Sequence, residues 1–326
     1  MAKITVLGSG GWGIALALCA HNSGHEVYLW SAFKDEISKL KRDRQNDKLL
    51  PGVVIDDGIV LSDDISVAEN SDLTIIAVPS VAVKSVTDRL SAVNNHGIVV
   101  NVAKGFEPET GRRLSEVISA VLPDDCIVVL SGPSHAEEVA RKIPTSLVAS
   151  SKSLVGAAIV QEFLSSEYLR IYTSDDVVGV ELGGALKNVI AVCAGICDGL
   201  GLGDNTKAAL ITRGLSEMSR LGVRMGANER TFSGLAGIGD LVVTCTSRHS
   251  RNNRFGKLVG EGVDIREALL RVGTVEGYYA AAIVHKLSKK YNEDLPLMEE
   301  CYRILYENRD VLSVVKHLML RPQKSE

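Results

Sequence analysis

The sequence predicts an α/β protein in which an amino-terminal, doubly wound and mostly parallel sheet is followed by an all-α carboxy-terminal domain. Two observations support this prediction. Short β-rich runs alternate with helical patterns as far as residue 173, and helical patterns alone fill the rest of the chain. A length of 326 residues suits two domains, each with a hydrophobic core of its own.

Seven runs in the first part of the chain have the composition of strands. The third and fourth are apolar on both faces, which is typical of central strands covered by helices on either side. They lead into Pro79-Ser80 and Lys104-Gly105, which we expect at the ligand-binding edge of the sheet. The predicted strands are Ile4–Leu7, Glu26–Trp30, Leu73–Val78, Ile98–Ala103, Ile127–Leu130, Ser146–Ala149 and Leu169–Tyr172.

Beyond Ser174 the pattern is helical, and residues that favour helix starts recur. We therefore place a domain boundary there, with domains at residues 1–174 and 175–326. No long flexible linker is present, so we expect the domains to pack closely, with the ligand site in a cleft between them. The start signals are Asp175-Asp176, Asp204-Asn205, Asn228, Asp264, Pro296 and Asp310.

The composition argues against several classes of function. Lys and Arg number 36 against 40 Asp and Glu, and the net charge of −4 disfavours a general attraction to nucleic acid or anionic membranes. The chain opens on a strand pattern rather than a signal sequence, and no charge-free apolar run approaches the roughly 18 residues of a membrane span. We therefore expect a cytoplasmic protein without stable membrane insertion.

Neither cysteine nor histidine predicts a metal site. The cysteines lack zinc-site spacing and are expected to be free thiols in a reducing compartment, and the histidines are isolated in the sequence. The cysteines are Cys19, Cys126, Cys193, Cys197, Cys245 and Cys301, and the histidines are His21, His25, His96, His135, His249, His285 and His317.

A glycine-rich turn follows the first predicted strand. Residues Gly8-Ser9-Gly10-Gly11-Trp12-Gly13 match G-x-G-x-x-G, and the apolar helical pattern Ile14–Ala20 continues from them. In a Rossmann-type fold Gly8 makes the tight turn, Gly10 lets the backbone approach a pyrophosphate, and Gly13 permits close helix packing. The turn therefore predicts binding of NAD(H) or NADP(H). The alternative is an ordinary strand-to-helix turn that happens to be rich in glycine.

The second predicted strand bears on the choice of cofactor. An acidic residue at its end would bind the ribose hydroxyl of NAD, but the strand ends Leu29-Trp30-Ser31-Ala32-Phe33 and the next carboxylate is Asp35. This absence removes repulsion of a 2′-phosphate, so we expect NADPH to be accepted. Lys34, Arg42 or Arg44 could reach that phosphate, or could simply solvate a helix.

One lysine lies in an unusually apolar stretch. Only Glu181, Lys187 and Asp198 are charged in Val177–Gly203, and a helix of this kind is buried on most sides. The Lys187 ammonium must then meet a carboxylate, an anionic ligand or a polar cleft. Because burial lowers a lysine pKa toward the range useful in a general base, Lys187 is a candidate catalytic residue. The alternative is a structural lysine paired with a core carboxylate. Gly183-Gly184 suit close approach of a ligand or of another backbone.

Two later segments supply further candidate ligands. Gly234–Leu241 is rich in glycine but lacks a preceding strand, so we interpret it as a tight turn that presents Asp240. A cluster of hydroxyl, amide and guanidinium groups follows, and its chemistry suits a phosphate. A solvated helix start is the alternative. The cluster consists of Thr244, Ser250, Arg251, Asn252, Asn253 and Arg254.

Six segments, taken in order, resemble one family. They are Gly8–Gly13, Val102–Phe106 with Glu109–Gly111, Ser131–Ser134, Glu181–Asn188, Ala236–Leu241, and Ser250–Asn252 with Phe255-Gly256. Together they resemble the bacterial NAD(P)-dependent sn-glycerol-3-phosphate dehydrogenases through nearly the whole chain. The resemblance implies reversible reduction of dihydroxyacetone phosphate to sn-glycerol 3-phosphate, which supplies glycerophospholipid synthesis.

The resemblance also implies roles for single residues. Lys187 matches the catalytic proton acceptor and Lys104 a residue that touches both substrate and cofactor; with Asp240 they are the candidate catalytic residues. The resemblance and the polar cluster described above together give the candidate substrate residues. They are Lys104, Gly132, Ser134, Lys187, Asp240, Thr244, Ser250, Arg251 and Asn252. The candidate cofactor residues are Gly8, Gly10, Gly11, Trp12, Gly13, Lys104, Ala136, Arg251, Val275 and Glu276.

The chain departs from the family pattern at two places. The family often has His or Arg just after the second strand to contact the cofactor, where this chain has Ala32-Phe33. The motif Val275-Glu276-Gly277 is present, but the segment before it is one residue short.

The sequence leaves two rival functions open. A reductase of the same architecture could act on a 3-hydroxy acid, ketopantoate or a pyrroline, whose carboxylates would replace the phosphate. A non-catalytic NAD(P)-sensing module is a rival of another class. The apolar helical domain makes a homodimer the expected assembly.

Overall fold

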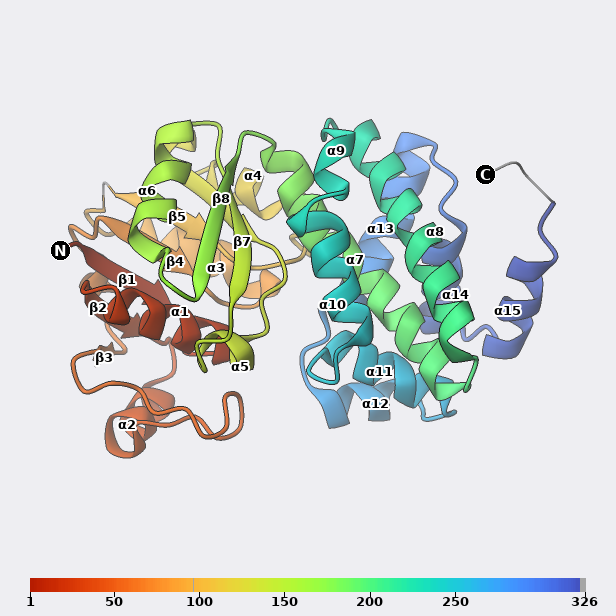
Figure 1. Ribbon diagram of the computed structural model, residues 1–326, viewed down its shortest axis with the longest axis horizontal. Helices are drawn as coiled ribbons and strands as arrows, with labels where there is room; N and C mark the ends of the chain where they lie inside the picture. Colours follow the sequence, from red (N-terminus) through yellow and green to blue (C-terminus); the bar gives the residue numbers. More distant parts are fainter. Residues whose placement is uncertain (96, 323–326) are drawn as a thin grey trace. The chain divides into compact units, whose positions relative to one another are not determined.

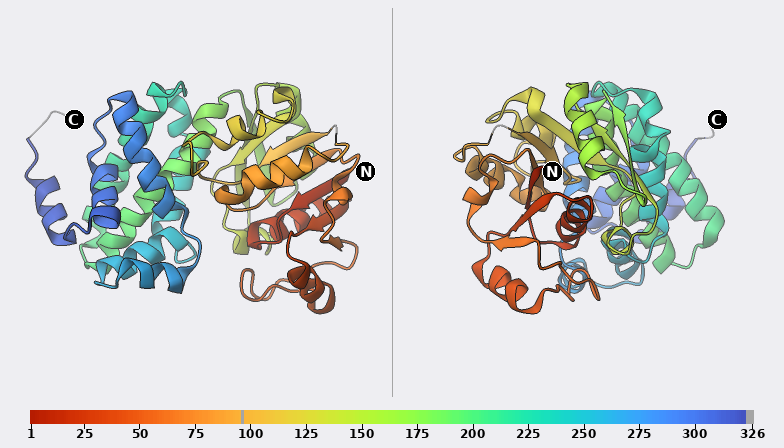
Figure 2. Two further views of the ribbon diagram at one scale, coloured as in Figure 1. Left: turned by 180° about the vertical axis from the view of Figure 1, so that it is seen from behind. Right: turned by 60° about the vertical axis from the view of Figure 1, so that its left-hand side comes forward.

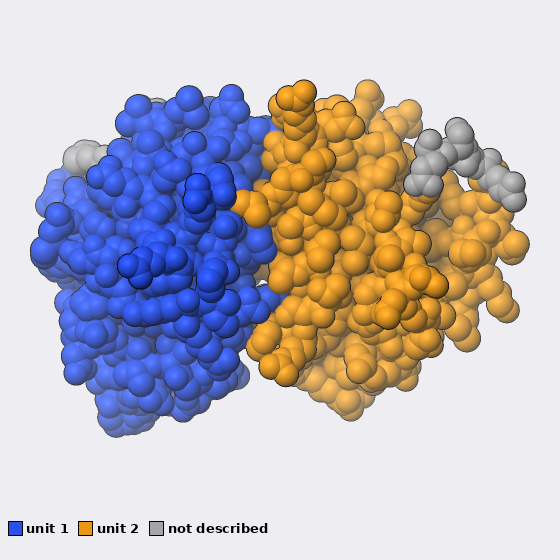
Figure 3. All heavy atoms as spheres, viewed as in Figure 1, with its two compact units in different colours: residues 1–181 blue, residues 182–326 orange. Residues whose placement is uncertain are grey.

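The computed structural model describes residues 1–95 and 97–322 of the chain. It divides into two compact units, unit 1 (Met1–Glu181) and unit 2 (Leu182–Glu326), which Figure 3 distinguishes by colour. The division falls within helix α7 (Val177–Gly199), a few residues beyond the boundary placed at Ser174 from the sequence.

An eight-stranded sheet is the framework of unit 1 (Figure 1). Its strand order is β3-β2-β1-β4-β5-β6-β7-β8, and neighbouring strands are parallel except β6 and β7, which pair antiparallel. This confirms the predicted doubly wound, mostly parallel sheet. The strands are β1 (Lys3–Leu7), β2 (Glu26–Trp30), β3 (Val60–Ser62), β4 (Leu73–Ile76), β5 (Ile98–Asn101), β6 (Ile127–Ser131), β7 (Thr145–Ser150) and β8 (Leu169–Ser174).

Helices cover both faces of this sheet (Figures 1 and 2). Helices α1 and α6 contribute to one apolar layer, and α3 and α4 contribute to the other. Strand residues alternate between the layers, since Ile75 of β4 belongs to the first and Ile76 to the second. The elements that connect the strands are α1 (Gly11–Asn22), α2 (Lys34–Asp43), η1 (Ile65–Ala68), α3 (Ser80–Leu90), α4 (Leu114–Ile118), η2 (Asp124–Cys126), α5 (Ala136–Val139) and α6 (Leu154–Leu164).

The strand order creates a switch point beside β1. Strand β1 lies between β2 and β4, so the chain first builds one half of the sheet and then crosses to the other. At the carboxyl ends of β1 and β4 the chain continues into Gly8 and Ala77. Ligands of doubly wound sheets bind at such a point. The glycine-rich turn therefore has the structural setting that its sequence predicts.

Unit 2 is built from helices. Asn228, Asp264 and Asp310 are N-cap residues whose side chains accept backbone N–H groups, and Pro296 is the first residue of α14. Helix α8 begins one residue before the predicted signal Asp204, which lies in its first turn. The elements after α7 are α8 (Gly203–Arg224), α9 (Glu229–Phe232), η3 (Leu235–Gly239), α10 (Asp240–Thr246), α11 (Arg251–Gly260), α12 (Ile265–Val272), α13 (Glu276–Tyr291), α14 (Pro296–Glu307) and α15 (Val311–Met319).

Helix α7 is long and apolar enough to cross a membrane by length and composition alone. In the folded chain, however, 89% of its most apolar 18-residue window is buried inside the protein. Helix α7 is therefore a core helix, as its sequence predicts.

Candidate functional site

The glycine-rich turn after β1 is tightly packed at two positions and open at a third. Gly8 has a φ of +126°, and a Cβ there would lie 2.4 Å from the Ala77 carbonyl oxygen. A Cβ on Gly13 would lie 1.9 Å from the Gly8 carbonyl oxygen, so neither position accommodates a side chain. At Gly10 no atom lies within 4 Å of such a Cβ. This open space, beside the unpaired N–H groups of the first turn of a helix, fits a pyrophosphate.

Other candidate cofactor residues lie beside this turn. Gly11 and Trp12 begin α1, and Ala136 begins α5. A Cβ on Gly11 would lie 3.6 Å from the Ala136 Cβ and 2.8 Å from the Leu49 carbonyl oxygen. Unit 1 therefore gathers the glycine-rich turn and Ala136 at the switch point.

The end of β2 differs from the expectation. Ser31 Oγ donates a 2.7 Å hydrogen bond to Glu36 Oε2, and Glu36 lies in the first turn of α2. The inference that this edge lacks an acidic group is therefore wrong. Helix α2 begins directly after Phe33 and turns a carboxylate back toward the strand end, which the count of residues past the strand does not reveal.

Two of the three cations considered for a 2′-phosphate are engaged elsewhere. Arg42 Nε pairs with Asp43 Oδ1 at 2.7 Å. Arg44 pairs with Asp57 at 3.3 Å and donates a 2.9 Å hydrogen bond to the Ile59 carbonyl oxygen. The third, Lys34, is the exposed first residue of α2.

Lys104 meets the Ser131–Ser134 motif near the carboxyl ends of β5 and β6. Its Nζ donates hydrogen bonds to the Gly132 carbonyl oxygen at 2.7 Å and to Ser134 Oγ at 2.9 Å. The parallel pairing of β5 with β6 brings the two segments together. Gly132 has a φ of +124°, a backbone conformation that other residues rarely adopt. Unit 1 thus groups three of the candidate substrate residues.

Lys187 is held by two side chains of α10. It is only 5% exposed, and its Nζ donates to Asp240 Oδ1 at 2.5 Å and to Thr244 Oγ1 at 2.6 Å. Thr244 Oγ1 in turn donates to the Asp240 carbonyl oxygen at 2.6 Å, and Asp240 is 1% exposed. Unit 2 therefore supplies the carboxylate partner that a buried ammonium requires. It also joins three candidate residues into one hydrogen-bonded group.

The segment before Asp240 is the π-helical turn η3, and no strand precedes it among the residues the structure describes in unit 2. A Cβ on Gly183 would lie 2.2 Å from the Ala236 carbonyl oxygen of this turn. Of the two explanations for the paired glycines, close approach of another backbone therefore applies at Gly183. This approach brings the start of α10 within reach of Lys187. Turns with π geometry are frequent at functional sites.

Asn252 connects three helices of unit 2. Its Nδ2 donates to Asn188 Oδ1 at 2.8 Å, and its Oδ1 accepts from the Gly277 backbone N–H at 2.9 Å. Asn188 follows Lys187 on α7, and Gly277 follows Glu276 at the start of α13. The Asn252 amide thus fixes the start of α13 against α7. Sequence reasoning gave Asn188 no role, although its place beside the buried lysine was a usable signal.

The rest of the polar cluster forms the start of α11. Ser250 is its N-cap and accepts a 3.2 Å hydrogen bond from the Asn253 backbone N–H. Arg251 is exposed at the first helical position. The cluster therefore lies at a helix start, but not at the solvated one of the alternative interpretation, because Ser250, Asn252 and Asn253 are buried. Arg251 itself remains exposed. Val275, the residue before α13, is fully buried and can offer a ligand only its backbone.

Comparison with known proteins assigns the chain to a family. The model of the N-terminal part of NAD-dependent glycerol-3-phosphate dehydrogenase matches residues 3–156, and that of the C-terminal part matches residues 176–316. The chain belongs to this family. The resemblance inferred from the sequence motifs is thereby confirmed.

Proteins similar to this chain carry the name of the same enzyme, and one of known structure has a closely similar fold. The glycerol-3-phosphate dehydrogenases (NAD(P)+) of Desulfitobacterium hafniense and Fusobacterium nucleatum are each 47% identical to this chain, cover all of it, and are themselves covered over 93% and 99% of their lengths. The crystal structure of the glycerol-3-phosphate dehydrogenase from Coxiella burnetii is 38% identical, with a TM-score of 0.93. That match covers 98% of this chain and 99% of the other.

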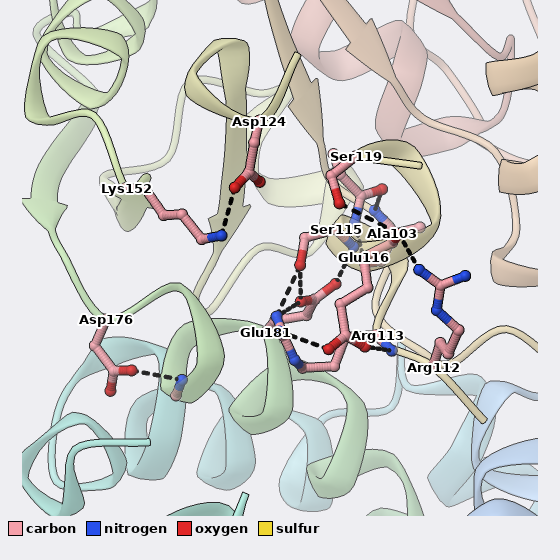
Figure 4. Close-up of polar contacts among 12 residues, drawn as sticks. Ala103, Arg112, Arg113, Ser115, Glu116, Ser119, Asp124, Lys152, Asp176 and Glu181 are labelled. Carbon is pink, nitrogen blue, oxygen red and sulfur yellow. Dashed lines mark hydrogen bonds and ion pairs between the residues drawn. The ribbon is translucent and has the colours of Figure 1, made fainter. Parts of the chain in front are cut away.

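In this member of the glycerol-3-phosphate dehydrogenase family, the segment that carries Lys187 begins with a buried carboxylate (Figure 4). Glu181 accepts hydrogen bonds from the Ser115 backbone N–H at 2.8 Å, from Ser115 Oγ at 2.6 Å and from Arg113 Nη1 at 2.9 Å. Burial raises the pKa of the Glu181 carboxyl, and Arg113 opposes that rise. The network fixes the beginning of α7 to the start of α4.

The thiols and imidazoles of this family member do not form a metal centre within the described ranges. All six cysteines are free, and burial raises the pKa of Cys245 to about 12. Among residues 1–95 and 97–322, no group of three or more His, Cys, Asp or Glu side chains could hold a metal ion. His96 lies outside these residues, so its predicted isolation stays a prediction.

Proposed function

We propose that this chain catalyses the reversible, NAD(P)(H)-dependent interconversion of dihydroxyacetone phosphate and sn-glycerol 3-phosphate, and so supplies glycerophospholipid synthesis. The observation that carries the proposal is the buried Lys187 ammonium held by Asp240 and Thr244, in a chain whose two parts both match the family. A lysine fixed in this way can exchange a proton with a substrate oxygen.

The proposed cofactor site is centred on the glycine-rich turn. Its residues fit a dinucleotide, because the open position at Gly10 and the first turn of α1 can accept a pyrophosphate. A nicotinamide held there would donate a hydride to carbon 2 of the ketone in its reduced form, and would accept a hydride from carbon 2 of the alcohol in its oxidised form. The proposed cofactor residues are Gly8, Gly10, Gly11, Trp12, Gly13, Lys104, Ala136, Arg251, Val275 and Glu276.

Lys187 is proposed to move the proton that accompanies hydride transfer. In the reducing direction Nζ donates a proton to the oxygen on carbon 2, and in the oxidising direction it accepts the proton of the hydroxyl group. Asp240 and Thr244 fix the position of Nζ before the substrate binds, so little reorganisation is needed during the reaction.

The remaining candidate residues are proposed to bind the substrate phosphate and hydroxyl groups. Arg251 offers a forked guanidinium at the N-terminus of α11, where the helix dipole also favours an anion. Ser250 and Asn252 hold that helix start in place. Lys104, which contacts Gly132 and Ser134 within unit 1, is proposed as a substrate ligand as well. Binding energy from the phosphate would align the reacting carbon.

The proposal is tested by the oxidation of NADH, and separately of NADPH, by the purified protein with dihydroxyacetone phosphate. We expect turnover with the phosphorylated ketone and almost none with unphosphorylated dihydroxyacetone, because the phosphate supplies much of the alignment. Inorganic phosphate should compete with the substrate. Turnover of ketopantoate without turnover of dihydroxyacetone phosphate would contradict the proposal.

We further propose a cytoplasmic homodimer. The reducing compartment suits six free thiols, and the exposed apolar side chains of unit 2, among them Leu270 and Leu312, suit a subunit contact. Light scattering at working concentration measures the mass, and a monomer mass would count against the dimer.

A further inference from the structure

We propose that Glu36, held in place by Ser31, makes this protein favour NADH over NADPH. The inference rests on the proposed function, because it concerns the dinucleotide site of unit 1. It goes beyond that function, because family membership leaves the choice between the two cofactors open. It also reverses the expectation drawn from the missing acid after β2.

Ser31 and Trp30 connect Glu36 to the dinucleotide turn. The Gly8 backbone N–H donates a 2.8 Å hydrogen bond to the carbonyl oxygen of Trp30, the last residue of β2. Ser31 follows directly, is buried, and donates from Oγ to Glu36 Oε2 at 2.7 Å. The Glu36 carboxylate is therefore hydrogen-bonded to Ser31, the residue that follows β2. The last residue of β2 is in turn hydrogen-bonded to Gly8, the first glycine of the turn. In this fold, a carboxylate at that strand end binds the ribose 2′-hydroxyl.

A 2′-phosphate at this strand end would meet the negative charge of Glu36. A 2′-hydroxyl can donate a hydrogen bond to the free lone pairs of Glu36, whereas a phosphate near pH 7 carries between one and two negative charges and is repelled by it. The Ser31 hydroxyl gives no compensation, because its hydrogen already points to Glu36. One carboxylate thus favours one cofactor and disfavours the other.

Two of the cations close by in sequence already have partners. Arg42 is paired with Asp43, and Arg44 with Asp57 and the Ile59 carbonyl oxygen, so both would have to leave existing partners to bind a 2′-phosphate. Lys34 is exposed at the start of α2 and is the cation nearest to Glu36 in the sequence that could still attract NADPH. An exposed lysine is flexible and strongly hydrated, whereas Glu36 is already oriented by Ser31.

Asp35 provides a matched control. It is the neighbouring carboxylate in the same first turn of α2, it carries the same charge, and it is exposed to solvent. Replacing it by Asn changes the local net charge as much as Glu36→Gln does. The difference between the two variants therefore isolates the oriented carboxylate from a general charge effect.

The experiment measures the dissociation constants of NADH and NADPH by calorimetry without any substrate, for the wild type and for Glu36→Gln, Ser31→Ala and Asp35→Asn. We expect the wild type to bind NADH about tenfold or more tightly than NADPH. Glu36→Gln should narrow this ratio about fivefold or more, with tighter NADPH and weaker NADH binding, and Ser31→Ala should narrow it less. Asp35→Asn should leave the ratio within about twofold of the wild type.

Four outcomes would overturn the inference. The first is a wild type that prefers NADPH, with Lys34→Gln abolishing that preference. The second is equal effects of Glu36→Gln and Asp35→Asn. The third is binding of neither dinucleotide, which would also remove the proposed function. Binding of both with a ratio independent of Glu36 would remove this inference alone.

Discussion

Lys187 is the residue on which the proposed chemistry depends most directly. We expect Lys187→Ala to lower kcat by about 10² to 10⁴, the usual contribution of a general acid–base group. Affinity for NADH should change little, because Lys187 is not among the proposed cofactor residues. Steady-state kinetics and calorimetry measure the two effects. Near-normal turnover would refute the role of Lys187 as the proton donor and acceptor.

Two further variants separate loss of chemistry from loss of folding. Lys187→Ala leaves the Asp240 carboxylate buried without its cation, which is destabilising in itself. Lys187→Ala combined with Asp240→Asn removes that charge and should recover stability without recovering turnover. Lys257→Ala removes an exposed lysine of α11 and should leave kcat unchanged.

At the scale of elements, two glycines should respond differently to the same substitution. Gly183→Ala would place a Cβ 2.2 Å from the Ala236 carbonyl oxygen and should cost about 1–3 kcal/mol or more of unfolding free energy. Gly10→Ala meets no atom within 4 Å and has a φ of −67°, which alanine adopts readily, so it should leave stability unchanged. Its methyl group would instead occupy the space proposed for the pyrophosphate.

Denaturant unfolding and NADH binding, measured on both variants, check this contrast. Gly10→Ala should weaken NADH binding by about tenfold or more while leaving the unfolding midpoint unchanged. A Gly10→Ala variant that binds NADH normally would mean that the pyrophosphate lies elsewhere.

Elements with a strong local signal were predictable from the sequence, and those that depend on distant contacts were not. The apolar strands and the caps at Asn228, Asp264 and Asp310 are local properties of the chain. Strand β3 has only three residues at the sheet edge, which are too few to show a period. Lys187 could be identified as a buried cation in need of a partner, but Asp240 lies 53 residues away and meets it only through the fold.

The same limit applies at the end of β2. The distance of Glu36 from the strand along the chain suggested that no acid stands there, and the turn into α2 brings it back. Spacing measured along a sequence describes a strand well. It fails where a helix begins soon after the strand, because the first turn of the helix can bring a later residue back to the strand end.

At the scale of the whole molecule, one buried carboxyl should make stability depend on pH. Glu217 of α8 is 2% exposed and accepts hydrogen bonds from the Leu297 and Met298 backbone N–H groups at the start of α14, at 2.8 and 3.1 Å. Burial raises its pKa from 4.5 to about 7, although these two N–H groups favour the ionised form. The folded chain therefore holds a proton here over a range in which the unfolded chain has lost it.

The sign of the effect follows from this proton. Between pH 4.5 and about 7 the folded state binds more protons at Glu217 than the unfolded state does, so its contribution to stability is greatest below that window and is lost as the pH rises through it. The total loss of unfolding free energy from this group is at most about 3 kcal/mol.

Glu217→Gln has no such proton, so the variant serves as a reference without this pH dependence. The unfolding free energy of the wild type, relative to that of the variant, should fall by up to this amount between about pH 5 and about pH 8. Urea unfolding across this range measures the difference, with Glu261→Gln, an exposed carboxylate, as the control. A difference that stays constant with pH would mean that Glu217 is already ionised in the folded chain at pH 5, and that the two N–H groups of α14 outweigh its burial.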